Sequence, residues 1–551
     1  MRTKLLPNKA HGVVSISRSL LMFFVAAVLI LSLTACSSTK PTTSSSVSSG
    51  GSTTPKKGGI LTLSHFGEPA IFGTPWSTRG ASADWSTLAC EPLLTFSEKL
   101  GVYEPVLAES WDWAADYMSI TFHLRKGVKF HDGTDFNAQA VAWNWQKRRD
   151  YQGPTIAGLS STKDWTVIDD YTIRFNLRFW TSIYLDGFYG ASPSIISPTA
   201  FDKNGGESWT NTHPVGTGPF IFKDYSRGQY LKFERNPNYW KNNGTPYLDE
   251  IDINVIKDTM VAQASLINGD IDVWREADIV ACAEIKEKYS DKFRVENLSS
   301  GNMILYFNSQ DPASPWSNLK MRQALEYAID KDLICTSIGK SLWIPNVEEL
   351  NGISVVGKAT TTPRKYDPVK AKQLMTEAGY ANGLSCKLVY NTGMTSPAII
   401  ALQNMLAKVN IELTLDPQAA VVWSDLTKKA PVGNEIRFER ESGGPTSIIT
   451  SASGDFGNTS LFYVGLLKPD GWQDTLDKLL ASKNADEKVQ LITKLDSMAY
   501  DNAMIVPLWK TYDLAAAVNS LKYAVPAGKG TSALTYADRP TFRLEYAWLD
   551  K

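Results

Sequence analysis

Residues 384–415 read LSCKLVYNTGMTSPAIIALQNMLAKVNIELTL, and this stretch carries the clearest fold signal in the chain. The runs 384–390 and 411–415 largely alternate apolar and polar side chains, which is typical of strands. Between them, Ser396 and Pro397 have the chemistry of a helix start, a capping residue followed by proline in the first turn. Strand, helix and strand in this order predict a βαβ unit and therefore a parallel or mixed sheet.

Helices and strands intermix in the rest of the chain. Asn318, Asp330 and Asp367 are each a capping residue before an apolar-periodic run, and Gly339 and Gly379 end the second and third of these runs. Short alternating runs occur earlier and predict a strand-rich N-terminal half. These runs are 60–64, 119–124, 172–177 and 231–234. The expected fold class is α/β.

The N-terminus has the features of an export signal. Basic residues and no acidic ones precede Cys36, and residues 20–31 are almost purely apolar. This run is short for a membrane-spanning helix but suits a signal peptide. It ends in Leu33-Thr34-Ala35-Cys36, which resembles the lipobox of bacterial lipoproteins, so we expect a signal peptide over 1–35 and a lipid on the Cys36 sulfur. Residues 36–57 are mostly Ser, Thr, Gly, Pro and Lys and predict a flexible tether.

Length, charge and cysteine content narrow the class of protein. The 551 residues exceed the size of one ordinary domain. The formal net charge is −1 with no basic patch, so nucleic acid is not an expected partner. The cysteines after Cys36 form no CxxC pair, which argues against a zinc site and leaves open whether they pair as disulfides. They are Cys90, Cys282, Cys335 and Cys386.

Sequence motifs of enzymes are absent or incomplete. No GxSxG of a serine hydrolase occurs. Residues 352–359 approach a phosphate-binding loop, but Ala359 stands where the magnesium-binding hydroxyl belongs. The histidines lack the spacing of metal ligands. We therefore expect no catalysis, no metal and no cofactor, although acids far apart in sequence can converge as they do in glycosidases.

The 17 tryptophans are a heavy aromatic load. Most should pack in the core, but Trp85, Trp343 and Trp423 lie outside clear helical stripes and are candidates for a ligand cleft. An indole face suits sugar rings, peptide side chains and cations.

From about residue 58 onward, the chain resembles the oligopeptide- and dipeptide-binding proteins, family five of the solute-binding proteins that serve ABC importers. The resemblance rests on short motifs that occur in the family's order along nearly the whole chain after the tether. They are PVLAESW at 105–111, FHLRKGVKFHDG at 122–133, VGTGPF at 215–220, RNPNYW at 235–240, FN at 307–308, MRQAL at 321–325, AID at 328–330, YDP at 366–368, AGY at 378–380 and VPLW at 506–509.

This resemblance implies a two-lobed fold of the periplasmic-binding-protein kind, class II, with the ligand cleft between lobes that close by a hinge. Lobe 1 would take residues 58–307 and 510–551, with an extra subdomain at 104–213, and lobe 2 would take 308–509. The expected protein is a monomer outside the cytoplasm, anchored to the membrane by its lipid. It would capture an oligopeptide or oligosaccharide and deliver it to a permease and ATPase complex.

Candidate ligand-binding residues in lobe 2 follow from the same resemblance. Peptide binders of the family hold the ligand's amino group with an aspartate in a W-x-x-D segment. The corresponding stretch here, 435–456, contains no tryptophan, so Glu439, Glu441 or Asp455 would have to replace that aspartate. This departure, together with the tryptophan content, slightly favours a neutral or hydroxylated ligand, while peptides, nickel chelates and opines stay open.

In lobe 1, the loop at 77–82 matches one that faces the cleft in the family, which makes Arg79 and Ser82 candidates. Arg79 would meet a ligand carboxylate with its two-pronged guanidinium. Two other functions fit the sequence less well: an anchored sensory or structural lipoprotein that feeds no transporter, and a secreted hydrolase. Neighbouring permease and ATPase genes would exclude the lipoprotein that feeds no transporter. Inactivity on chromogenic peptides and glycosides would exclude the hydrolase.

The lipobox generates a prediction about membrane attachment. The mature protein should partition into detergent with lipid on Cys36, because the thioether requires that sulfur. A Cys36→Ser variant should accumulate as uncleaved precursor or leave the membrane, as measured by phase partitioning and intact mass. Mature protein that retains Leu33 and Thr34 would contradict the assignment.

Overall fold

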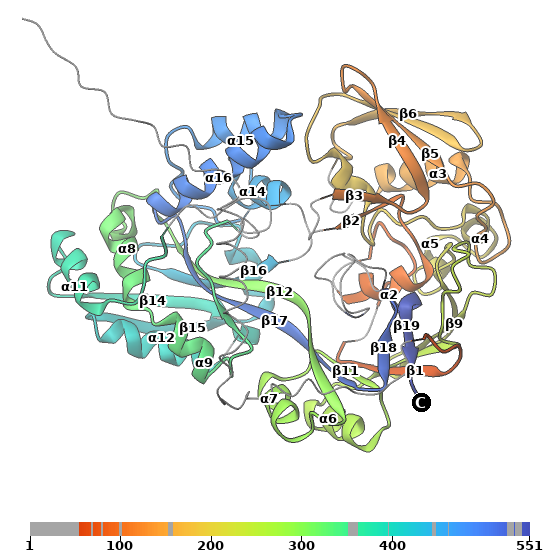
Figure 1. Cartoon of the computed structure of the whole chain (residues 1–551). Coiled ribbons are helices and arrows are strands. Elements are labelled where there is room, and N and C mark those ends of the chain that lie inside the picture. Colours follow the sequence, from red (N-terminus) through yellow and green to blue (C-terminus); the bar gives the residue numbers. More distant parts are fainter. Residues whose placement is uncertain are drawn as a thin grey trace, which may run out of the picture. The chain divides into compact units, whose positions relative to one another are not determined.

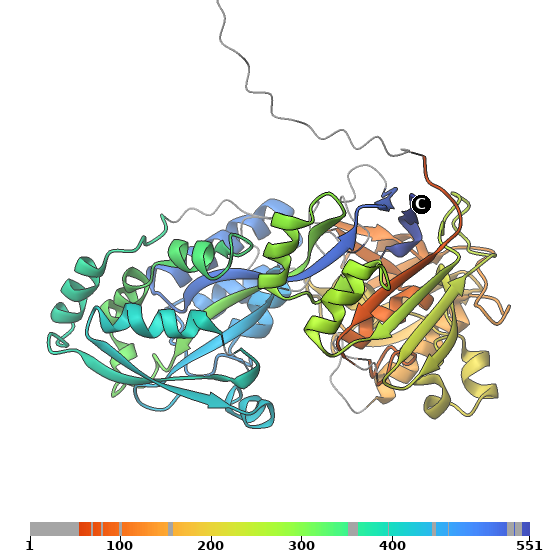
Figure 2. The ribbon, with the colours of Figure 1, turned by 90° about the horizontal axis from the view of Figure 1, so that it is seen from below.

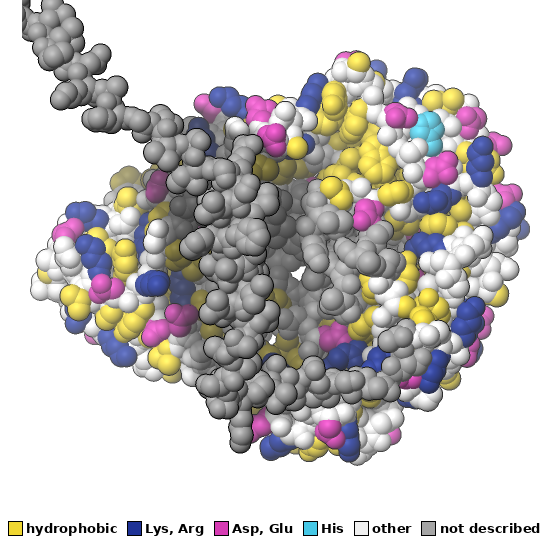
Figure 3. All heavy atoms as spheres, viewed as in Figure 1, with side chains coloured by type: hydrophobic (Ala, Val, Ile, Leu, Met, Phe, Trp, Pro, Cys, Tyr) yellow, Lys and Arg dark blue, Asp and Glu magenta, His cyan; other side chains and the backbone are white. Residues whose placement is uncertain are grey.

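The computed structural model describes residues 54–551, apart from 68–69, 79–80, 98–101, 152–157, 351–361, 395, 444–447, 461, 526–533 and 535–542. The predicted signal peptide, most of the tether, Cys36 and Arg79 lie outside the described residues. Within the described part, no helix is both long and apolar enough to cross a membrane. Basic and acidic side chains are interspersed on the face in Figure 3, without a large patch of one sign.

One mixed sheet of 11 strands runs through both lobes (Figure 1). Its order is β15-β14-β16-β12-β17-β11-β1-β10-β9-β8, with β13 added beside β17. The strands are β1 (Ile60–His65), β8 (Phe220–Ser226), β9 (Tyr230–Arg235), β10 (Glu250–Val255), β11 (Val273–Arg275), β12 (Phe293–Phe307), β13 (Ile344–Pro345), β14 (Leu384–Asn391), β15 (Ile411–Gln418), β16 (Ile436–Gly443) and β17 (Val506–Val518).

The two longest strands, β12 and β17, join the lobes. They pair antiparallel from Phe293 opposite Val518 to Leu305 opposite Val506, with two register shifts. At one end β17 pairs with β11 of lobe 1, and at the other β12 pairs with β16 of lobe 2. Figure 2 shows β17 passing from one lobe into the other. A shared pair of strands gives the lobes a connection that can bend without either core being broken.

The predicted βαβ unit is confirmed. Strands β14 and β15 pair in parallel, with Leu384 opposite Ile411, and α12 (Pro397–Ala407) connects them with proline in its first turn. Its buried face carries Leu402 and Leu406, which lie in the lobe 2 core. Three further helices begin where predicted: α8 (Leu319–Ala328), α9 (Lys331–Ser337) and α11 (Pro368–Glu377). Each is capped by the expected side chain, which accepts a hydrogen bond of 2.9 Å from a first-turn amide.

A separate four-stranded sheet lies within residues 104–213. Its order is β4-β5-β7-β6, and α3 (Ala138–Asp150) packs against it. Its core holds Trp145, Phe175 and Phe188, and the ring centroids of Trp145 and Phe188 stack 4.8 Å apart. Burial of each such ring stabilises the unit by about 1.5–3 kcal/mol. The strands are β4 (Ala108–Trp113), β5 (Ser119–Leu124), β6 (Thr162–Asp169) and β7 (Thr172–Leu177).

The four described cysteines do not pair. Cys90, Cys282, Cys335 and Cys386 are free and buried. Burial is the largest cause that raises the pKa of each thiol, to about 12 for the last three. These residues therefore act as small apolar core side chains.

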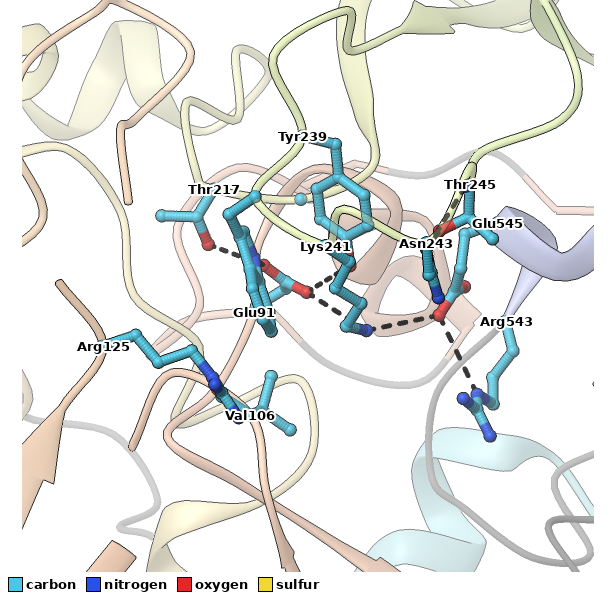
Figure 4. A network of polar contacts seen from close by, with 12 residues as sticks. Glu91, Val106, Arg125, Thr217, Tyr239, Lys241, Asn243, Thr245, Arg543 and Glu545 are labelled. Atoms are coloured by element: carbon cyan, nitrogen blue, oxygen red, sulfur yellow. Dashed lines mark hydrogen bonds and ion pairs between the residues drawn. The ribbon is translucent and has the colours of Figure 1, made fainter. Parts of the chain in front are cut away.

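A buried carboxylate, Glu91, links distant parts of lobe 1 (Figure 4). It follows α2 (Ala81–Ala89) and accepts hydrogen bonds from Thr217 Oγ1 at 2.9 Å, Tyr239 Oη at 2.7 Å and Trp240 Nε1 at 2.6 Å. Burial raises its pKa, while the charge of Lys241 and the three donors act in the opposite direction.

Lys241 extends this network to the C-terminal segment. Its Nζ lies 3.9 Å from Glu91 and 3.6 Å from Glu545, and Arg543 Nε lies 3.9 Å from Glu545 (Figure 4). The last residues of the chain are thereby tied to the end of α2.

Two glycines of the VGTGPF motif bring Thr217 to Glu91. A Cβ on Gly216 would lie 2.2 Å from the carbonyl oxygen of Ala89, and one on Gly218 would lie 2.6 Å from that of Leu88. Only glycine permits this close approach of two backbones. The motif is therefore required for packing against α2.

The Glu91 network predicts a large loss of stability on truncation. Glu91→Ala leaves the donors of Thr217, Tyr239 and Trp240 without this acceptor and removes one of the two carboxylates near Lys241, which should lower the free energy of unfolding by about 3–5 kcal/mol. Exposed Glu109→Ala, the control, should change it by less than about 0.5 kcal/mol. Urea titration followed by tryptophan fluorescence measures both. Equal midpoints for the two variants would show that the network does not hold lobe 1 together.

Candidate ligand-binding site

Lobe 2 contains a cavity of about 550 Å³, a volume suited to a small solute. Its walls come from β12, β16, α13 (Ala420–Leu426), α14 (Ile448–Phe456) and the loop that follows α14. The lining residues are Tyr306, Trp423, Ser424, Thr427, Glu439, Arg440, Thr450, Ser451, Gly454, Asp455, Phe462 and Tyr463.

Aromatic rings form one side of the cavity. The rings of Tyr306 and Tyr463 meet edge to face at 5.1 Å, and Tyr463 stacks on Phe456 at 5.4 Å. Tyr463 has a φ of 49°, a left-handed conformation that costs energy for a residue with a Cβ. Packing against two rings holds this conformation and keeps the tyrosine in the cavity wall.

Two carboxyl groups, those of Glu439 and Asp455, line the same cavity. Burial raises the pKa of Glu439 to about 7, although the Arg440 amide and the Trp423 indole donate to it. Burial also raises the pKa of Asp455 to about 6. The cation in the lining, Arg440, is paired with Asp513 at 3.0 Å, and the charge of Arg437, which is paired with Glu435, also acts to lower the pKa of Glu439. Among the described residues, no lysine or arginine forms a salt bridge with either carboxylate.

Glu441 lies two residues further along β16, opposite Asn302 of β12. It is buried but is not part of the cavity lining, and Asn302 Nδ2 donates to its Oε2 at 3.1 Å. Its Oε1 has no hydrogen-bond partner among the described residues. Burial first, then the negative charges of Asp455 and Glu348, raise its pKa to about 8. Three acidic groups with raised pKa values therefore cluster at this end of β16.

The remaining predicted site residues lie elsewhere. Trp85 is fully buried in the lobe 1 core, where Arg275 lies 4.8 Å from its ring centroid. Trp343 stacks on Trp509 with ring centroids 5.6 Å apart. Ser82 belongs to α2. The structure thus brings Trp423, Glu439 and Asp455 together, with Glu441 adjacent.

The sequence did not indicate Tyr306, Thr450 and Tyr463 as lining residues. Alternation along β12 places Tyr306 on the same side as Asn302, but only the pairing of β12 with β16 brings that side to Glu439. This pairing joins segments more than 100 residues apart, and no local signal encodes it.

Comparison with known proteins identifies the family. Residues 102–474 match the bacterial extracellular solute-binding proteins, family 5 (Middle), and the chain belongs to this family. Heme-binding protein A of Haemophilus influenzae is 28% identical over 454 residues, covering 76% of this chain and 80% of that protein. Oligopeptide-binding protein AppA of Bacillus subtilis is 29% identical over 399 residues, covering 68% of this chain and 71% of that protein.

Solved structures share the fold. The substrate-binding protein CtaP of Listeria monocytogenes superposes with a TM-score of 0.75 at 20% identity, covering 90% of this chain and 100% of that one. The protein DppA of Helicobacter pylori, solved with the peptide STSA, gives a TM-score of 0.69 at 22% identity, covering 90% of this chain and 99% of that one. The two-lobed α/β fold expected from the motifs is confirmed, and the chain is an extracytoplasmic solute-binding protein.

The raised pKa values predict a pH dependence of stability. Glu439, Glu441 and Asp455 have folded-state pKa values of about 7, 8 and 6, above those of an unfolded chain, so the folded protein binds extra protons. Their stabilising contribution is complete below about pH 4 and is lost as pH rises through 6 to 8. In the ligand-free protein, the variant Glu439→Gln/Glu441→Gln/Asp455→Asn should lose less stability between pH 5 and 8 than the parent.

Urea titrations at both pH values measure this difference. The exposed control Glu109→Gln should keep the parental dependence. A triple variant that also keeps it would show that these carboxyls are not perturbed by burial.

Proposed function

We propose that this chain is the solute receptor of an ABC importer, anchored through lipid on Cys36, and that its solute carries a cationic amine. The observation that carries the proposal is the pair of carboxyls, Glu439 and Asp455, in a cavity that supplies no salt-bridging cation among its described residues. The printed names of relatives agree with this class, since they include an oligopeptide-binding protein and a structure with a bound peptide.

An ammonium group would complete the charge balance of the cavity. When the cavity holds no cation, burial favours the protonated carboxyls; an entering ammonium favours the ionised form. The attraction between the ammonium and one carboxylate about 4 Å away contributes about 4 kcal/mol at the effective dielectric constant near a protein surface. The Trp423 ring adds about 0.5–2 kcal/mol if the cation lies over it. These gains offset the desolvation of the ammonium.

The cavity supports a neutral, hydroxylated ligand, which the sequence slightly favoured, less well than it supports an amine. That preference depended on the missing W-x-x-D segment and on the tryptophan content. Of the three tryptophans, only Trp423 lines the cavity, and Glu439 lines it as well. A neutral sugar would leave these partly buried carboxyls without a cation, so we favour an oligopeptide with a free amino group.

Delivery to a membrane permease with its ATPase follows as the role of the closed, loaded receptor, and the chain is proposed to catalyse no reaction. A monomer suffices, because both lobes and the connecting strands belong to one chain. Attachment through the predicted tether would keep the receptor near that permease.

The proposal predicts selective binding of free amines. Calorimetry should detect binding within a panel of di- to tetrapeptides, and N-acetylation of the best binder should weaken it at least about tenfold. Glu439→Gln should cause a similar loss, whereas the exposed control Glu412→Gln should bind like the parent. Because binding requires ionised carboxylates with pKa values of about 7 and 6, affinity should increase from pH 5.5 to 8.

The same panel includes β-linked oligosaccharides and the Trp423→Ala variant. Tight binding of a neutral oligosaccharide that Trp423→Ala abolishes and Glu439→Gln leaves unchanged would contradict amine recognition and restore the sugar hypothesis.

A further inference from the structure

The four-stranded unit of residues 104–213 touches lobe 2 far from the connecting strands. The contact segment begins at Trp180, after β7, and faces the junction of α15 (Trp472–Ala481) and α16 (Ala485–Asp501). Ser182 N donates to the carbonyl of Leu480 at 2.7 Å, and Ser182 Oγ donates to that of Leu479 at 3.1 Å. Figure 1 shows α15 beside this unit.

A helix C-terminus explains why these bonds form. The last carbonyls of α15 have no amide partner within the helix, although the Ser482 amide that follows the helix donates to that of Leu479 at 3.3 Å, so they remain available to further donors. Trp180 Nε1 donates to a third one, that of Ala481, at 3.1 Å. Three donors of residues 180–182 therefore satisfy three consecutive terminal carbonyls of α15.

An aromatic cluster on the same unit receives a lysine from lobe 2. Lys483 Nζ lies 4.3 Å from the ring centroid of Tyr117 and 5.9 Å from that of Trp180. It also donates to the carbonyl of Asp116 at 3.4 Å. Trp113 packs edge to face on Trp180 at 4.8 Å and stacks on Tyr117 at 5.7 Å, which keeps these rings in place.

The contact also reaches the ligand cavity. Asp186, in the 3-10 helix Tyr184–Phe188, accepts hydrogen bonds from Tyr103, the residue just before its own unit, and from Thr450 of α14. Thr450 lines the cavity. The segment that docks on α15 thus also fixes one side chain of the cavity wall.

We propose that residues 180–186, with Tyr117, form a latch that holds the two lobes closed without help from the solute. The connecting strands β12 and β17 fix only one side of the interlobe contact, and the latch closes another. Because it uses side chains and helix carbonyls rather than the ligand, it sets the balance of open and closed receptor before a solute arrives. Through Thr450, closing the latch also completes the cavity. This inference is independent of which solute binds.

The double variant Trp180→Ala/Lys483→Ala tests the latch in the full chain with no added solute. It removes one hydrogen bond to α15, the lysine with its ring contacts, and its bond to Asp116. The population ratio of closed to open receptor should fall about three- to tenfold. Hydrogen exchange at the Ser182 amide should accelerate by the same factor, and the radius of gyration from small-angle scattering should increase.

The matched control is Phe179→Ala/Lys494→Ala, which removes an exposed aromatic residue beside the latch and an exposed lysine of α16. It should leave both measurements at parental values, and far-ultraviolet circular dichroism should be unchanged in both variants. The latch is refuted if the two double variants exchange and scatter alike. It is also refuted if the Ser182 amide of the parent exchanges as fast as an unstructured one.

Discussion

Lobe 1 depends on one buried charge, the carboxylate of Glu91, because segments far apart in the sequence meet at it. Thr217 comes from the VGTGPF motif, and Tyr239 and Trp240 come from RNPNYW. Arg125 of FHLRKG lies 4.9 Å from the ring centroid of Trp240 and donates to the carbonyl of Val106 in PVLAESW. Two of the family's motifs thus supply the donors to one buried carboxylate, and two more are linked to it through Trp240. The four-stranded unit of residues 104–213, which contacts α15, is joined to lobe 1 next to these contacts.

The carboxyls of lobe 2 differ from Glu91 in what surrounds them. Glu326, a structural acid, is paired with Arg364 at 2.7 Å, and both side chains are at most 5% exposed. Glu439 and Asp455 line a cavity instead, and no lysine or arginine of the described residues bridges to them. Carboxyls that line a cavity and have no such bridge are suited to a positive charge that comes from outside.

Much of the fold was predictable because its signals are local. Capping side chains at Asn318, Asp330 and Asp367 and alternation in β14 and β15 correctly located helices and strands. The cavity was predictable only in part, since its walls meet through the non-local pairing of β12 with β16. Trp85 was a candidate for the cleft because it lies outside a clear helical stripe in the sequence. It is fully buried in the lobe 1 core instead, because tertiary packing decides burial.

The central claim is that the lobe 2 cavity holds the amine of a captured solute. Native mass spectrometry of the protein purified from its own cells, followed by fragmentation of the released small molecule, tests this claim most directly. The account predicts one bound solute per chain that contains a free amine and is absent from Glu439→Gln protein prepared in the same way. A solute without an amine, retained equally by the Glu439→Gln variant, would contradict it.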